Sequence, residues 1–165
     1  MSDWWIPVTT TLAFFVVFMI LHWTAPMIVS KIFGKHHLEV FEQLPDTYQT
    51  YWRRLVRSQV YYMYAGVVGV ILITVEYRSV DELLFKYHRF IEVNLCVALS
   101  HWILAVVEDA GSISLLSADI RHPLFVLAIA LIYMVHHAVT IFAFVFILST
   151  HKLPSLGVFG TCTSL

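Results

Sequence analysis

Four long apolar stretches, separated by shorter polar segments, set the pattern of this chain. A helix needs about 20 mostly apolar residues to cross the roughly 30 Å hydrocarbon core of a bilayer, and each stretch approaches or exceeds that length. The fourth stretch would be about 40 Å long as a helix, which fits one tilted span and is too short for two. The predicted spans run from Trp4 to Val29, from Ser58 to Val75, from Glu92 to Ala110 and from Pro123 to Thr150.

The composition supports a membrane protein. Of the 165 residues, 59% are hydrophobic and 13% are charged, and the mean hydropathy is +0.78. We therefore expect an all-α, multi-pass transmembrane bundle of about four spans, with residues 1–165 forming a single domain. The formal net charge of −1 provides no broad basic surface, so nucleic acid is not an expected partner.

The densest group of basic residues lies in the link between the first two predicted spans. This link runs from Lys31 to Arg57 and also contains Lys35, Arg53 and Arg54. Because positively charged links tend to stay on the cytoplasmic side, we expect this link to be cytoplasmic and both termini to be lumenal or exoplasmic.

Polar residues form a stripe on each of the last two predicted spans. In the fourth span, helical spacing places Tyr133, His136, His137 and Thr140 on one face. In the third span, polar residues recur every seven positions, with Asp109 and Ser112 close to the same line: Asn94, His101 and Glu108.

Polar groups inside hydrocarbon are costly unless they pair with each other or line a wet cavity, so both stripes should face the bundle interior. Consecutive spans joined by a short link should pack antiparallel. We therefore expect His101 within reach of His136 or His137, and Glu108 or Asp109 closer to Arg121 or His122.

Several roles fit the histidine pair. The histidines could hold helices together through hydrogen bonds, or His136 and His137 could act as general bases, because an imidazole accepts a proton near neutral pH. Recognition of a lipid headgroup is a third possibility. A metal centre is disfavoured, because adjacent histidines on one helix point about 100° apart and the chain lacks repeated HxxxH or HxxHH motifs. We predict no metal and no cofactor.

Three short segments resemble one family, the TLC domain proteins, which include the ceramide synthases and the translocating-chain-associated membrane proteins. The segments are "VHHAVT", the acidic "AVVEDAG" and "YWRRLVRSQV", and the resemblance covers residues 51–147. Ile129 and Ala130 stand where ceramide synthases have an Asp-Phe pair, and Leu55 stands where many members have an arginine. Residues 154–165 resemble an interrupted hydrophobic element, which implies a C-terminally truncated member.

The resemblance implies a role in membrane lipid homeostasis, with lipids bound, sensed or distributed through an interior polar cavity. One alternative is a ceramide synthase-like N-acyltransferase that uses acyl-CoA as a substrate, with His136 or His137 as the catalytic base. Another is a non-catalytic truncated product or a helix-packing adaptor. The family implies the endoplasmic reticulum, Golgi or plasma membrane, and a partner helix or oligomer could complete the bundle. The candidate cavity-lining residues are Asn94, His101, Glu108, Asp109, Tyr133, Thr140, Arg54 and Ser58.

Overall fold

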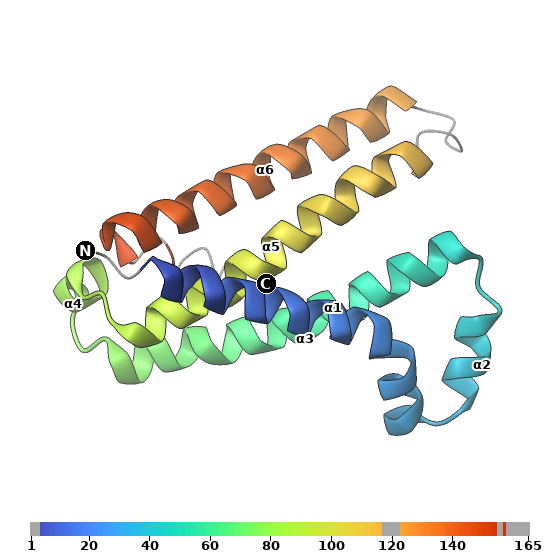
Figure 1. Ribbon diagram of the computed structural model, residues 1–165, viewed down its shortest axis with the longest axis horizontal. Coiled ribbons are helices and arrows are strands. Elements are labelled where there is room, and N and C mark those ends of the chain that lie inside the picture. Colours follow the sequence, from blue (N-terminus) through green and yellow to red (C-terminus); the bar gives the residue numbers. More distant parts are fainter. Residues whose placement is uncertain (1–3, 117–122, 155–156, 158–165) are drawn as a thin grey trace.

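The protein is a bundle of long helices joined by short helices and turns (Figure 1). The computed structural model describes residues 4–116, 123–154 and 157. In chain order the elements are α1 (Trp5–Phe33), α2 (His36–Glu42), α3 (Asp46–Ile71), the π-helical η1 (Leu72–Glu76), α4 (Val80–Phe85), α5 (Arg89–Leu116) and α6 (Pro123–Thr150).

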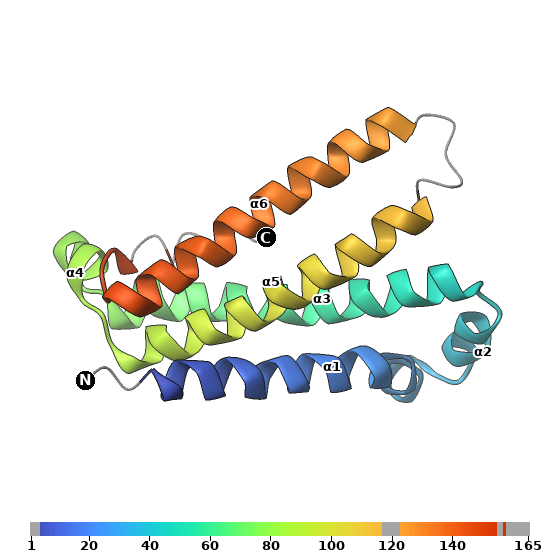
Figure 2. The same cartoon turned by 45° about the horizontal axis from the view of Figure 1, so that its top comes forward.

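Four of the described helical segments are long and apolar enough to cross a membrane, which confirms the predicted number of spans. They are Trp5–Phe33, Asp46–Glu76, Arg89–Glu108 and Leu131–Thr150. Successive long helices run in opposite directions, as Figure 2 shows. The fold is thus an all-α, multi-pass transmembrane bundle.

Helix α5 is the central helix of the bundle. In its apolar window 72% of the residues are buried, against 22–28% in the other three spans. It packs against α1, α3 and α6, whereas α6 packs mainly against α5 and diverges from the rest of the bundle toward its own N-terminus (Figure 2). Side chains of α5 are therefore the ones most able to meet residues from all three other spans.

The helix boundaries differ from the predicted ones chiefly at the second span. Helix α3 begins at Asp46, twelve residues before the predicted start at Ser58. The hydrophobic pattern excludes the arginine-containing turns from the predicted span, because arginine is not apolar. The helical backbone hydrogen bonds nevertheless continue through these turns. Arg53, Arg54 and Arg57 therefore lie on a helix and not in a flexible link. The predicted cytoplasmic location of the segment from Lys31 to Arg57 stays a prediction.

The other boundaries lie closer to the predicted ones. Helix α1 continues past the buried Pro26 to Phe33, and α6 runs from Pro123 to Thr150 as predicted. Of the tail assigned to 154–165, Pro154 and Gly157 are described and are buried. The remaining residues of that tail lie outside the described part of the chain.

Polar side chains of α5 bond to the backbone of α1 without introducing charge. The Ser100 hydroxyl donates to the backbone oxygen of Thr11 at 2.7 Å, and the Cys96 thiol contacts the backbone oxygen of Pro7 at 3.6 Å. Ser100 also bonds to the Cys96 backbone oxygen in its own helix. Small polar residues of this kind let membrane helices approach closely, which explains the extensive contact between α1 and α5.

The outer faces of the long helices are apolar. On α6 the side chains opposite the polar stripe are exposed, including Val135 and Phe142, and Met63 is exposed on α3. Such a surface would drive aggregation in water but is solvated by lipid acyl chains. The predicted apolar face of α6 is therefore available to the bilayer.

Replacing Ser79 with alanine is expected to loosen α4 by about 1 kcal/mol, a usual cost for losing an N-cap. The Ser79 hydroxyl accepts a hydrogen bond from the Glu82 backbone N–H at 3.1 Å, and the Glu82 carboxylate accepts one from the Arg78 backbone N–H at 2.9 Å. Amide hydrogen exchange in α4 should be faster in Ser79→Ala, whereas Ser79→Thr, which retains the hydroxyl, should exchange like the wild type. If α4 exchanged its amide hydrogens at the same rate in Ser79→Ala as in Ser79→Thr, the Ser79 hydroxyl would not be stabilising the start of α4.

The same cap gives α4 a pH dependence of definite sign. The hydrogen bond from the Arg78 backbone N–H lowers the pKa of Glu82 below its ordinary value of 4.5. The contribution of ionised Glu82 is therefore fully present above pH 4.5, and it is lost as the pH falls through the lowered pKa.

Candidate functional site

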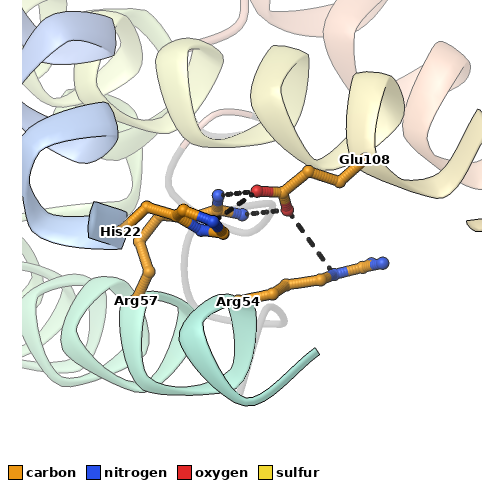
Figure 3. A network of polar contacts seen from close by, with 4 residues as sticks. All are labelled: His22, Arg54, Arg57 and Glu108. Carbon is orange, nitrogen blue, oxygen red and sulfur yellow. Dashed lines mark hydrogen bonds and ion pairs between the residues drawn. The ribbon is translucent and has the colours of Figure 1, made fainter. Parts of the chain in front are cut away.

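A buried ion pair joins α3 to α5. The Nη1 and Nη2 atoms of Arg57 donate to the two carboxylate oxygens of Glu108, the second bond measuring 2.7 Å (Figure 3). The Arg57 side chain is completely buried and that of Glu108 is 15% exposed. A guanidinium and a carboxylate bind most strongly in this fork-to-fork geometry, so the pair fixes the relative height of the two helices.

Two further basic side chains lie within 4 Å of the Glu108 carboxylate. The Nε atom of Arg54 on α3 lies 3.8 Å from Glu108 Oε2, and Nδ1 of His22 on α1 lies 3.4 Å from Oε1 (Figure 3). Arg54 and Arg57 are three residues apart, which places them on one face of α3. Glu108 therefore connects three spans at one level of the bundle.

These contacts of Glu108 were not among those expected from the sequence. The sequence predicted Arg121 or His122 near Glu108 or Asp109, which stays a prediction; the contacts described for Glu108 come from α1 and α3. Arg121, His122 and the side chain of Asp109 lie outside the described residues. The pairing with α3 was missed because the arginines had been assigned to a link.

Next to this ion cluster lies a polar cavity of about 230 Å³ between α3, α5 and α6. Each of the three helices contributes three residues to its lining. The lining residues are Arg54, Ser58 and Tyr62 from α3, His101, Trp102 and Ala105 from α5, and Tyr133, His136 and His137 from α6.

Aromatic rings organise the α5 side of this cavity. The imidazole of His101, 1% exposed, stacks on Tyr61 with a centroid distance of 3.9 Å and an angle of 11°. The Trp102 ring lies 5.2 Å from His101, 4.8 Å from His137 and 6.0 Å from His136, measured between centroids. His137 is buried and His136 is exposed, so the pair spans the inner and outer parts of the cavity.

The structure brings together six of the residues selected from the sequence. Arg54, Ser58, His101, Tyr133, His136 and His137 all line the one cavity. His101 of the third-span stripe therefore lines the same cavity as His136 and His137, but the expectation that both stripes face the interior is only partly met: His137 is buried, whereas Tyr133 and His136 are exposed. Whether His136 or His137 takes a proton from a substrate stays a prediction.

The other selected residues are held elsewhere. Asn94 accepts a hydrogen bond from the Tyr64 hydroxyl and donates to the Phe90 backbone oxygen, and Thr140 donates to the His136 backbone oxygen within α6. Asn94, His101 and Glu108 share a helix face, but seven residues separate neighbours by about 10 Å along the axis. Of these three residues only His101 lines the cavity. Glu108 does not line it but lies 3.8 Å from Arg54, which does.

Sequence reasoning missed several residues that build this region. Arg54, Ser58 and Tyr62 are spaced four residues apart, which places them on one face of a helix. Had the predicted helix included Arg54, this spacing would have added Tyr62 to the candidate cavity-lining residues. Arg57 and His22 carried no comparable signal, because a single polar residue does not identify its partner. Trp102 looked like an ordinary apolar residue of a span.

The lining has a definite chemical character. Arg54 is a cation, Ser58, Tyr62 and Tyr133 carry hydroxyl groups, and the three histidines can donate or accept. No carboxylate is among the described residues that line the cavity. Such a lining suits a ligand that offers oxygen acceptors or negative charge, and it can also hold a proton acceptor beside a hydroxyl or an amine.

Comparisons with protein-family models, with curated proteins and with solved structures found no match to this chain.

Proposed function

We propose that this protein binds membrane lipids by their polar headgroups, in the cavity between α3, α5 and α6, and so acts in membrane lipid homeostasis. The observation that supports the proposal best is a polar cavity, lined by a cation, hydroxyls and histidines, within a bundle whose outer faces are apolar. Polar side chains that line a cavity between apolar helices need a polar occupant, whether water or a ligand.

The size of the cavity argues for a headgroup and against a whole lipid. A volume of about 230 Å³ is below the range of about 300–1,000 Å³ that is usual for drug-sized ligands. A diacyl lipid is larger than such ligands, so its chains have to stay outside. The cavity therefore suits the polar end of an amphiphile whose acyl chains remain in the bilayer.

The helices that line the cavity also offer a surface for those chains. The side chains of Met63 on α3 and of Ile132 and Val139 on α6 are exposed and apolar. Tyr133 and His136 line the cavity and are themselves exposed, so the cavity communicates with the surface on the α6 side. A lipid can thus place its headgroup inside without removing its chains from the membrane.

Filling the cavity is expected to abolish headgroup binding. Ala105 is 4% exposed and lines the cavity, so Ala105→Trp places an indole where the headgroup would lie. The full chain in nanodiscs would be exposed to photoactivatable analogues of phosphatidic acid, phosphatidylcholine and diacylglycerol. We expect at least one analogue to label cavity residues, and Ala105→Trp to reduce that labelling by on the order of tenfold, equal to about 1.4 kcal/mol.

The matched control is Ala138→Trp, which adds the same ring at an exposed position of α6 outside the cavity lining. Because Ala105→Trp could unfold the bundle, Ala105→Leu provides a smaller filling whose folding is checked by its unfolding midpoint. Wild-type labelling in both folded Ala105 variants would show that the proposed site is wrong.

A further inference from the structure

Two buried polar atoms of the cavity lining have no hydrogen-bond partner among the described residues. They are Nδ1 of His101 and Nε1 of Trp102, whose residues are 1% and 5% exposed. A buried polar atom without a partner is costly and uncommon, and it calls for a ligand or a water. The indole N–H of Trp102 can only donate, so the group that satisfies it must supply an acceptor atom.

Two further donors come from α3. Arg54 lines the cavity with its side chain 25% exposed, and Ser58 lies one turn further along the same face. The Nε atom of Arg54 lies 3.8 Å from Oε2 of Glu108. The two carboxylate oxygens of Glu108 also accept hydrogen bonds from Nη1 and Nη2 of Arg57. A ligand that attracts the Arg54 guanidinium therefore leaves Glu108 compensated, and the ion cluster tolerates an added anion.

We propose that the cavity selects lipids with a phosphate monoester headgroup, an inference that rests on the proposed function above. Residues that carry hydrogen-bond donors line the cavity from two helices, Arg54 and Ser58 from α3 and Trp102 from α5. A phosphate monoester presents three terminal oxygens in different directions, whereas a carboxylate presents two in one plane. The phosphate therefore matches donors that converge from separate helices, and its charge matches a lining whose described residues include a cation and no carboxylate.

The test compares headgroups on the same chain in nanodiscs. Displacement of a photoactivatable phosphatidic acid would be measured with unlabelled phosphatidic acid, phosphatidylcholine, diacylglycerol, a fatty acid and inorganic phosphate. We expect phosphatidic acid to compete about tenfold better than diacylglycerol, because it adds charge-assisted hydrogen bonds. Inorganic phosphate shares the headgroup chemistry but lacks the chains, so it should compete only weakly.

Variants of single residues, each with a matched control, identify the side chains that cause the preference for phosphatidic acid. Arg54→Gln should remove most of the preference for phosphatidic acid over diacylglycerol, and Trp102→Phe should reduce it by several-fold while retaining an aromatic ring. Arg53→Gln and Trp52→Phe are the controls. Arg53 lies over the rings of Trp23 and Phe41, and Trp52 packs on Phe41, so neither residue lines the cavity. Both controls should retain the full preference.

The outcomes separate this inference from the proposed function. Equal competition by phosphatidic acid and diacylglycerol, with labelling still lost in Ala105→Trp, would overturn the phosphate selectivity and leave headgroup binding intact. Competition by the fatty acid equal to that by phosphatidic acid would also overturn it. Inorganic phosphate competing as well as phosphatidic acid would overturn the assignment to a lipid. Labelling that is insensitive to both Ala105 variants would instead remove the proposed function.

Discussion

Glu108→Gln is expected to destabilise the bundle by about 3–5 kcal/mol, the usual cost of removing one partner from a buried ion pair. The substitution retains the shape of the side chain but removes its charge. The completely buried guanidinium of Arg57 would then have no counter-charge among the described residues, and it would lie beside a second guanidinium on Arg54. Titration with a denaturing detergent from mild-detergent micelles, followed by circular dichroism, measures the loss.

Glu39→Gln provides the control for removing a carboxylate. The Glu39 side chain is 68% exposed and lies 3.8 Å from His36, and exposed ion pairs contribute at most about 1 kcal/mol. The double variant Arg57→Met, Glu108→Leu should recover much of the stability lost in Glu108→Gln, because apolar residues of similar volume remove both charges together. An unfolding midpoint for Glu108→Gln equal to that of the wild type would contradict the buried pair.

Phe144→Ala is expected to have the second largest effect, at about 2 kcal/mol. Phe144 is 1% exposed and belongs to the hydrophobic core shared by the long helices. In soluble proteins the same substitution costs about 3–5 kcal/mol, part of which is transfer of the ring from water. Lipid is itself apolar, so in a membrane mainly the lost packing and the cavity remain.

The matched control lies two residues earlier on the same helix. Phe142 is 72% exposed on the outer face of α6, where lipid chains can replace the contacts of a deleted ring. Phe142→Ala should therefore leave the unfolding midpoint within about 0.5 kcal/mol of the wild type, as is usual for surface substitutions. Equal losses in the two variants would mean that α6 does not pack as described.

Helices α6 and α3 show which helix boundaries the hydrophobic pattern can predict and which it cannot. It located α6 from end to end because an apolar run and a helix coincide there, with Pro123 at the first position. For α3 the pattern started at Ser58, since hydropathy measures the preference for lipid and not the continuity of backbone hydrogen bonds. The twelve omitted residues contain Arg54 and Arg57, so the hydrophobic pattern left both in a link, although the family resemblance placed Arg54 among the candidate cavity-lining residues.

The candidate site could be predicted where one helix face carried several polar residues. His101, His136 and His137 were selected because helical spacing groups each with other polar groups, and they do line one cavity. The partner of Glu108 could not be deduced, because a bidentate pair between residues 51 positions apart depends on how the helices pack. Trp102 could not be recognised either, since its importance arises from an indole N–H that is buried without a partner among the described residues.

The long sequence separation of Arg57 and Glu108 also constrains the order in which the protein can be assembled at the ribosome. Helix α3 is synthesised and enters the membrane before α5 exists, so its arginines meet the bilayer before their carboxylate is available. The N-terminal turns of α3 must then wait at the interface, where the long side chains can reach water. Only after α5 has been inserted can Glu108 pair with Arg57 and approach His22, so the polar contacts that join α1, α3 and α5 cannot form until the third span is in place.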